Sequence, residues 1–192
     1  MNLAHILVIL VICHSNALDT TGNDCFILSE NVVRDGSSII VSGVGRMCPC
    51  LQNNGLVEFH SDIKSLQFTE EVTSVGSRCF ENLLELESVT FNSNIIEIGE
   101  YSFYRTNISQ LTIPENVVKI HSYAFSEIYA LKTIIFDESD QSKELILEGK
   151  TFSNCYNLIE FNIPRRLLQF DSKILDNCIS MSKLTVAENH QK

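Results

Sequence analysis

The 192-residue sequence contains no tryptophan, only three prolines, and no Cys-x-x-Cys pair among its seven cysteines. It also lacks the His-Glu-x-x-His and Gly-x-Ser-x-Gly motifs and any phosphate-binding glycine loop. These motifs carry the chemistry of zinc proteases, serine hydrolases and nucleotide-dependent enzymes. Their absence predicts a protein that is not an enzyme, with no catalytic residue, no cofactor and no metal ligand.

Positive charge is scarce as well, because 24 acidic side chains stand against 14 basic ones and the formal net charge is −10. Phosphate backbones bind clustered Lys and Arg, so this composition argues against a nucleic-acid partner. An acidic surface favours solubility instead. No stretch of the sequence is apolar for long enough to cross a bilayer, and no hydrophobic C-terminal tail suggests a glycolipid anchor.

The N-terminal segment has the features of a secretion signal. Residues 1–17 carry no charged side chain, and Ile6 to Cys13 form an unbroken apolar run. Ser15 and Ala17 are small residues at the spacing that a signal peptidase accepts. We therefore expect a signal peptide over residues 1–17 and a secreted or cell-surface protein. The alternative is that this segment forms a buried N-terminal strand or helix.

A spacing of apolar residues recurs from Ile63 to Val186. Each copy has an apolar residue, two variable residues, a second apolar residue, one variable residue, and then Phe, Ile or Val. The copies begin at Ile63, Leu86, Ile108, Leu131, Leu158 and Met181, which are 22 to 27 positions apart. A period of this size is typical of a solenoid. One such turn cannot bury its own apolar side, so the turns must stack and share a core.

A column of aromatic residues repeats in phase with this spacing. It consists of Phe80, Phe103, Phe125 and Phe152, with Leu175 in the fifth place. Five residues before each stands another apolar residue, namely Val75, Ile98, Ile120, Leu147 and Phe170. We expect the rings to stack between turns, since burying one Phe contributes about 1.5–3 kcal/mol.

The clearest copy reads Leu111-Thr-Ile-Pro114-Glu-Asn-Val117-Val-Lys-Ile120-His-Ser-Tyr-Ala124-Phe125. It resembles the BspA-like class of leucine-rich repeats, whose copies read L-x-x-I-x-I-P-x-x-V-x-x-I-G-x-x-A-F-x-x-C. The resemblance implies an α/β-type solenoid of about five to six turns, with mostly short parallel β-strands, one per turn. The sequence departs from the pattern where His121 replaces Gly and where Leu175 replaces Phe.

The segment before the repeats is predicted to cover the first apolar edge of the solenoid, as a terminal element must. Phe26 to Val33 and Ser38 to Gly43 have the composition of two strands. Asp35-Gly36 lies between them and is a hairpin turn signal. The predicted organisation is a signal peptide over 1–17, an N-terminal cap with a β-hairpin over 18–60, a solenoid over 61–186 and a tail over 187–192.

Cys25, Cys48 and Cys50 lie in the predicted cap. In an oxidising compartment we expect Cys25 to form a disulfide with Cys48 or Cys50, which leaves the third thiol unpaired. The alternative is a metal site that combines these three cysteines with His60. The spacing of zinc ligands, such as Cys-x-x-Cys, is missing and argues against it.

The other cysteines of the predicted mature chain fall on repeat positions. Cys155 and Cys178 occupy the same place in successive turns, three residues after the aromatic column, and Cys79 directly precedes Phe80. We expect all three to be buried thiols that act as small apolar groups.

The third and fifth residues of each copy should point outward along a short strand. They include Gln67, Thr90, Thr112, Ile135, Asn162 and Thr185 at the fifth position and Ser88, Gln110, Thr133 and Glu160 at the third. Leucine-rich repeat proteins usually bind partners on this face, so the resemblance makes these residues the candidate binding face. The alternative is that Thr and Ser here only satisfy β propensity.

Three surface features complete the prediction. Asn107-Ile108-Ser109 is the only glycosylation sequon, so Asn107 is a candidate glycan site. The fourth copy carries extra polar residues within Asp137 to Glu144, which should form a surface loop. No C-terminal cap follows the last copy, so either its own turn closes the stack or the exposed end pairs with another chain.

The resemblance implies a secreted or surface-associated module that binds extracellular or host proteins in adhesion. One alternative is a structural subunit of a surface coat that self-associates through its C-terminal end. A second alternative is a shortened family member without a function.

Overall fold

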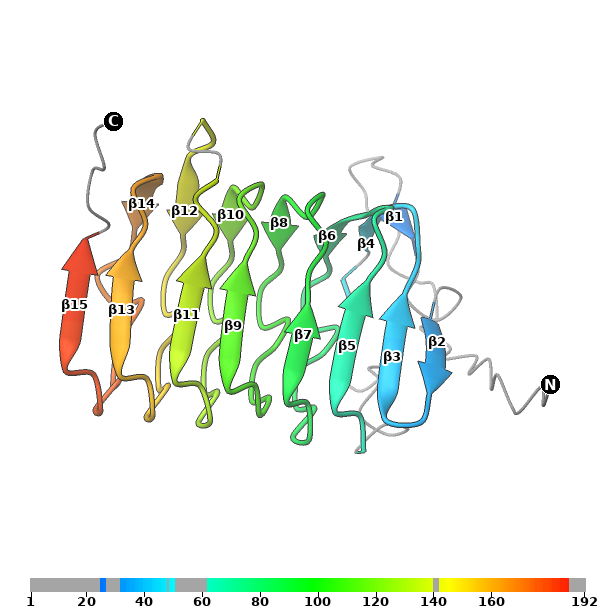
Figure 1. Cartoon of the computed structure of the whole chain (residues 1–192), viewed down its shortest axis with the longest axis horizontal. Coiled ribbons are helices and arrows are strands. Elements are labelled where there is room, and N and C mark those ends of the chain that lie inside the picture. Colours follow the sequence, from blue (N-terminus) through cyan, green and yellow to red (C-terminus); the bar gives the residue numbers. More distant parts are fainter. Residues whose placement is uncertain (1–24, 27–31, 48, 51–61, 140–141, 187–192) are drawn as a thin grey trace.

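The computed structural model describes residues 25–26, 32–47, 49–50, 62–139 and 142–186. Throughout these residues the chain winds into a solenoid of strands and turns, and no helix occurs among them (Figure 1). The predicted solenoid fold is confirmed. The predicted signal peptide, the tail over 187–192 and the residues around His60 lie outside the described residues.

Each repeat contributes one strand to a front row. After the hairpin strand β3 (Ser38–Val41), the row contains β5 (Ser65–Phe68), β7 (Ser88–Thr90), β9 (Gln110–Ile113), β11 (Thr133–Phe136), β13 (Glu160–Ile163) and β15 (Lys183–Val186). The strands run parallel and stand side by side (Figure 1). Their hydrogen-bonded ladder is interrupted between β7 and β9 and between β11 and β13.

A second row of strands forms a continuous rear sheet. Its order is β1 (Cys25–Phe26), β4 (Gly45–Met47), β6 (Val72–Val75), β8 (Glu97–Ile98), β10 (Lys119–Ile120), β12 (Leu145–Leu147) and β14 (Leu167–Phe170), all parallel. The sequence predicted one strand per turn, and the structure adds this second one. Rear strands such as β8 and β10 have only two residues, so they contain no alternating pattern that sequence reading can recognise.

The aromatic column forms the predicted ladder through the core. Phe80, Phe103, Phe125 and Phe152 are fully buried. Successive rings stack with centroids 5.4, 5.3 and 5.6 Å apart. Side chains from both rows surround the ladder, which therefore joins each turn to its neighbours. The continuous core explains how such short strands persist, since most of their stability comes from packing.

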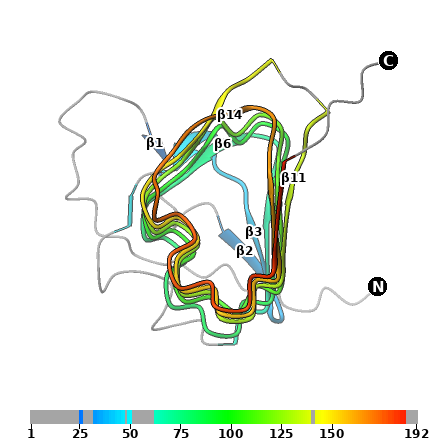
Figure 2. The ribbon, with the colours of Figure 1, turned by 90° about the vertical axis from the view of Figure 1, so that its left-hand side faces the viewer.

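A turn segment follows each of the rear strands β6, β8, β10, β12 and β14 and leads back to the front row, and in the end-on view these segments superpose from turn to turn (Figure 2). Each of the four central segments contains two residues other than Gly with positive φ. These residues are Arg78, Asn82, Tyr101, Arg105, Tyr123, Glu127, Lys150 and Asn154. Backbone hydrogen bonds hold the segments in place, for example from Phe80 N to Ser102 O and from Asn82 N to Tyr104 O.

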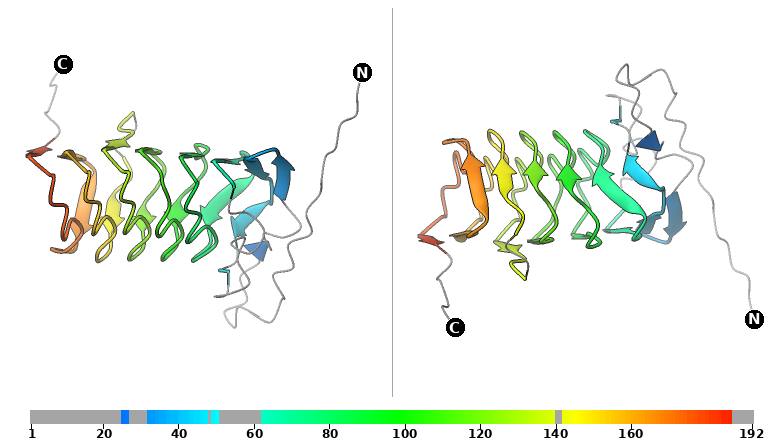
Figure 3. Two further views of the ribbon diagram at one scale, coloured as in Figure 1. Left: turned by 90° about the horizontal axis from the view of Figure 1, so that it is seen from below. Right: turned by 90° about the horizontal axis from the view of Figure 1, so that it is seen from above.

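The N-terminal hairpin is present, but its first strand includes Arg34 and Asp35, which were expected in the turn, and Phe26 lies in the separate strand β1. β2 (Val32–Asp35) pairs with β3 in antiparallel register, and Gly36 in the connecting turn has a φ of 59°. β3 then pairs in parallel with β5, so the second hairpin strand also serves as the first strand of the front row. Figure 3 shows the hairpin at one end of the stack and β15 at the other.

The structure corrects the cysteine prediction. Cys50 forms a disulfide with Cys79, with their Cα atoms 4.9 Å apart, so the Cys25–Cys50 pairing is wrong and Cys79 is not a buried free thiol. The peptide N–H of Cys50 donates to Ser77 O, which brings the cap segment against the first repeat. Cys48 lies outside the described residues, so the Cys25–Cys48 pairing stays a prediction.

The two remaining repeat cysteines are buried thiols, as expected. Cys155 and Cys178 donate to the carbonyl oxygens of Phe125 and Phe152 at 3.3 and 3.2 Å. Burial raises the pKa of both thiols above the usual value. Among the described residues no group of three His, Cys, Asp or Glu side chains is placed to hold a metal ion.

The extra residues of the fourth copy protrude from the stack, as the yellow segment in Figure 2 shows. Arg166 of the next turn crosses the place that a regular fourth turn would fill. Its Nη1 donates to Val117 O and its Nη2 donates to Pro114 O at 3.0 Å, and the side chain is buried. One arginine therefore ties the fifth copy directly to the third.

Candidate functional site

The structure gathers the predicted binding residues on the outer side of the front row. Seven of the ten are exposed, while Thr133, Glu160 and Thr185 are half-buried. Parallel register sets them beside one another, as in the pairs Gln67 with Thr90 and Thr112 with Ile135. We call this surface the front face. The alternation of inward and outward residues follows the prediction.

The chemistry of the front face is mostly that of neutral hydrogen-bonding groups. Thr185 Oγ1 donates to Asn162 Oδ1 at 3.2 Å, and Lys183 pairs with Glu160 at 2.9 Å. Ile135 adds an apolar side chain that is 46% exposed. Such a surface suits the flat or extended side of another macromolecule.

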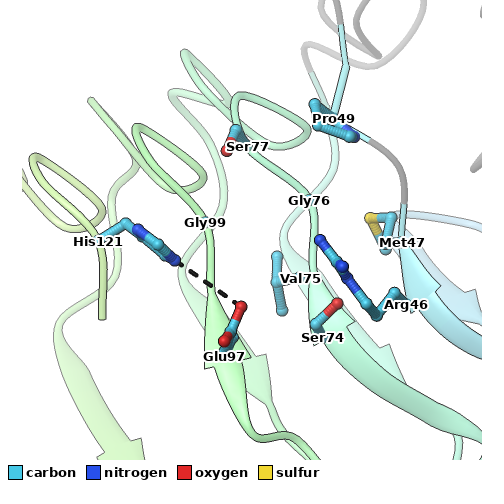
Figure 4. Close-up of a pocket in the computed structure, with 10 residues that line it drawn as sticks. All are labelled: Arg46, Met47, Pro49, Ser74, Val75, Gly76, Ser77, Glu97, Gly99 and His121. Atoms are coloured by element: carbon cyan, nitrogen blue, oxygen red, sulfur yellow. Dashed lines mark ion pairs between the residues drawn. The ribbon is translucent and has the colours of Figure 1, made fainter. Parts of the chain in front are cut away.

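A small groove of about 60 Å³ opens at the rear sheet near the cap. Figure 4 shows Arg46, Ser74, Glu97 and His121 around it. His121 Nε2 lies 3.8 Å from Glu97, and its Nδ1 lies 3.2 Å from Glu148. The groove is far smaller than the sites that hold metabolites, which are about 300–1,000 Å³. His121 replaces the repeat Gly, and sequence reading did not foresee its two acidic neighbours.

A second, unforeseen surface lies on the turn segments. The sequence has five tyrosines, and all of them lie in these segments: Tyr101, Tyr104, Tyr123, Tyr129 and Tyr156. None is buried. We call this surface, together with the charged residues that contact the rings, the tyrosine ridge. A signal was available, because four of the five tyrosines recur at fixed distances from the Phe column and no core position explains them.

One part of the ridge is a stack of side chains from four successive turns. The rings of Tyr101 and Tyr123 stack with centroids 4.6 Å apart. The Arg78 guanidinium lies 4.3 Å from the Tyr101 centroid, and the Lys150 ammonium lies 5.6 Å from the Tyr123 centroid. These distances are within the range of cation–π attraction. The two rings are therefore held between two cations.

The other part of the ridge centres on Glu127. Arg105 Nε and Tyr129 Oη donate to its carboxylate at 2.7 and 2.9 Å, and the rings of Tyr129 and Tyr156 stack at 5.1 Å. Burial and then the hydrogen bond to Glu127 raise the pKa of Tyr104 to about 12. Burial opposes ionisation of Glu127, but hydrogen bonds from Arg105, Tyr104 and Tyr129 prevail and lower its pKa.

Two other predicted features have defined positions. Asn107 is exposed and follows the ridge residue Arg105 by two positions, so a glycan there has access to solvent. Its glycosylation stays a prediction. At the C-terminal end the last turn exposes several apolar side chains. These are Leu168, Phe170, Ile179, Leu184 and Val186, each more than half exposed.

The repeats match the family model of the BspA-type leucine-rich repeat region, in six copies over residues 58–182. The match covers well over half of the sequence, and the chain belongs to this family. No curated protein matches the chain. The described residues contain no helix with the length and apolar character that a membrane crossing requires.

Solved structures of bacterial proteins share the fold. A leucine-rich repeat protein from Eubacterium ventriosum is 19% identical with a TM-score of 0.61 and matches 84% of this chain. The pneumococcal vaccine antigen PcpA is 18% identical with a TM-score of 0.56 and matches 82%. A leucine-rich cell surface protein from Faecalibacterium prausnitzii is 20% identical with a TM-score of 0.50 and matches 88%. This chain spans only 43%, 49% and 49% of those three proteins.

Proposed function

We propose that the protein is a binding module that acts outside the cell and holds a protein partner on its front face. The observation that carries the proposal is the row of parallel strands that sets exposed hydrogen-bonding side chains in register over successive turns. A rigid stack keeps these groups at a constant spacing of about 4.8 Å. A partner then meets a surface that needs little reorganisation on binding.

Several observations support a location outside the cell. The Cys50–Cys79 disulfide fits an oxidising compartment, because cytosolic thiols are kept reduced. The N-terminal sequence has the pattern of a signal peptide. Among the similar structures, one is described as a cell surface protein and another as a vaccine antigen. Adhesion to host or matrix proteins is the function that family membership suggests.

The residue types on the front face indicate how tightly a partner can bind there. Tyr, Trp and Arg, which dominate binding hot spots, do not occur at its ten predicted positions. Each contact on the face should therefore contribute little by itself. Tight binding requires a partner that is extended or repetitive and that engages several turns at once.

Binding to immobilised fibronectin, laminin and collagen tests this function. Replacing Thr90→Lys and Thr112→Lys places two bulky charges in the middle of the front face, and we expect affinity for the bound matrix protein to fall about tenfold or more. Gln169→Lys is the matched control, since Gln169 is exposed on the rear strand β14. Equal affinity of the double variant and the native chain would exclude the front face as the binding surface.

A second candidate function is self-association as a subunit of a surface coat. The exposed apolar side chains of the last turn, including Phe170, Leu184 and Val186, favour it, because large exposed apolar patches mark contact surfaces. In sedimentation velocity over a range of concentrations we expect association by the native chain. Leu184→Lys with Val186→Lys should abolish it, whereas Val44→Lys, at an exposed apolar position of the cap, should not. A native chain that is monomeric throughout would exclude this role.

A further inference from the structure

We propose that the tyrosine ridge is a second binding surface, distinct from the front face, and that it takes an extended acidic segment of a protein partner. In this segment two carboxylates four positions apart pair with Arg78 and Lys150, and the side chain midway between them rests on the Tyr101–Tyr123 stack. The inference does not depend on what the front face binds.

The first argument is the backbone conformation at which the stack is built. Arg78, Tyr101, Tyr123 and Lys150 have φ values of 62°, 54°, 59° and 59°, in the left-handed region. Gly and Asn adopt this region most readily, and bulky side chains are disfavoured there. None of these four side chains lies in the core. Large residues held in a disfavoured conformation on the surface point to a role in recognition.

The second argument is composition together with order. Tyr and Arg are the residues most enriched in binding hot spots, and this chain places every tyrosine on the ridge. The rings are already stacked, at 4.6 Å for Tyr101 with Tyr123 and 5.1 Å for Tyr129 with Tyr156. Because these side chains are ordered before a partner arrives, binding costs less conformational entropy.

The third argument is charge. In a chain of net charge −10, the stack presents two cations and two phenolic hydroxyls and contains no carboxylate of its own. The nearby carboxylates include Glu81, which pairs with Arg78 at 3.2 Å; Glu127, which pairs with Arg105; the exposed Glu100; and Asp171, whose carboxylate lies beside Gly149. No carboxylate among the described residues forms an ion pair with Lys150. The stack therefore favours a partner that supplies anionic acceptors.

The geometry sets the form of that partner. Arg78 and Lys150 stand three turns apart, which is about 14 Å at about 4.8 Å per turn. An extended peptide rises about 3.3 Å per residue, so side chains four positions apart stand about 13 Å apart and point to the same side. The side chain midway also points to that side and meets the two tyrosines. An acidic, an apolar and a second acidic residue at alternate positions thus fit the stack.

The chain has no tryptophan, so its fluorescence comes from tyrosine, and every tyrosine lies on the ridge. Tyrosine fluorescence therefore reports binding at the ridge selectively. The probe is the peptide Gly-Ser-Glu-Thr-Leu-Thr-Glu-Ser-Gly, which has no aromatic residue. We expect it to change tyrosine emission in a saturable way, and increasing salt should weaken the effect. The same peptide with Gln in place of both Glu should bind about tenfold more weakly or not at all.

Variants locate the site. Arg78→Gln with Lys150→Gln should weaken peptide binding about tenfold, while Lys183→Gln, an exposed lysine of the front face, should leave it unchanged. Circular dichroism shows whether the variants fold. No change in emission up to about 1 mM peptide would overturn the proposal, as would equal binding by the double variant. Binding of polygalacturonate without binding of the peptide would instead make the ridge a site for acidic glycans.

Discussion

Gly99 lies at the end of β8, where the backbone of the preceding turn leaves no room for a side chain. A Cβ added there would lie 2.5 Å from Ser77 N and 2.8 Å from Val75 O, both of which are backbone atoms. Gly is therefore required at position 99 because these two turns approach each other closely, and not because of positive φ. At Gly149 an added Cβ would first meet the Asp171 side chain at 3.5 Å, an ordinary contact.

These two glycines provide a matched pair of substitutions. Gly99→Ala should lower the free energy of unfolding by about 1–3 kcal/mol, because the turns must separate to admit the methyl group. Gly149→Ala should change it by no more than about 1 kcal/mol. Urea unfolding followed by circular dichroism measures both. Equal effects of the two substitutions would contradict the close approach at Gly99.

Two tyrosines of the ridge, Tyr104 and Tyr129, should titrate at a higher pH than an ordinary tyrosine. The pKa of Tyr104 is raised to about 12, and the pKa of Tyr129 is raised as well, with the carboxylate of Glu127 contributing to both shifts. A raised pKa in the folded state contributes stability that is complete below the unfolded value near 10. That contribution is lost as the pH rises from about 10 towards about 12.

Phenolate absorbance measured against pH tests this environment. Glu127→Gln removes the carboxylate charge and should move the late part of the titration to lower pH. Glu100→Gln is the control, because Glu100 raises the pKa of Tyr101 but is not among the causes of the Tyr104 shift. A titration curve that is the same for the native chain and Glu127→Gln would show that Glu127 does not influence these phenols.

At the scale of elements, the front strands, most of which bury apolar side chains, could be predicted from the sequence. The short rear strands β8 and β10, which bury only one side chain each, were missed. The strands of the front row follow from inward residues such as Leu111 and Ile113, which the dry interior restricts to apolar types. β8 contains only Glu97 and Ile98, and hydrogen bonds from adjacent turns define it more than its own composition does. No local pattern marks so short a strand.

The two proposed binding surfaces show the same limit. The front face could be located because its residues alternate with the core positions of a strand. The tyrosine ridge was missed because Tyr101 and Tyr123 lie in turns, where burial does not restrict the residue type. Cys50 was misassigned for a related reason. It precedes the repeats, so their register could not place it beside Cys79, from which it is 29 residues distant in sequence.

Arg166 is the element-scale feature with the clearest energetic consequence. Its guanidinium is buried and donates to the carbonyl oxygens of Val117 and Pro114, two copies earlier in the stack. Arg166→Met leaves both carbonyls without this donor and should lower the free energy of unfolding by about 3 kcal/mol. Lys132→Met, at an exposed position, should have little effect. Thermal unfolding compares them, and equal midpoints would contradict the role of Arg166.

At the scale of the whole molecule, the disulfide joins the cap to the repeats. Cys50 and Cys79 are 29 residues apart in sequence, so their bond closes a loop in the unfolded chain as well. In the chain-entropy account a loop of this size stabilises the fold by about 3–4 kcal/mol. Replacing both residues by Ser should lower the free energy of unfolding by this amount. Reduction of the native chain should produce a similar loss, and an unchanged unfolding midpoint in either case would contradict it.

The interrupted ladder of the front row has a mechanical consequence. The rear sheet is hydrogen-bonded from β1 to β14, whereas the front strands are bonded in three separate groups. We therefore expect the molecule to bend more easily along its front than along its back, although single backbone hydrogen bonds, such as Asn107 N to Leu86 O, still link the turns at the breaks. Bending should separate the front strands at the two breaks, between β7 and β9 and between β11 and β13. This separation would change the curvature of the front face. If the front face binds a partner as proposed, we expect its curvature to change on binding while the hydrogen bonds of the rear sheet stay intact.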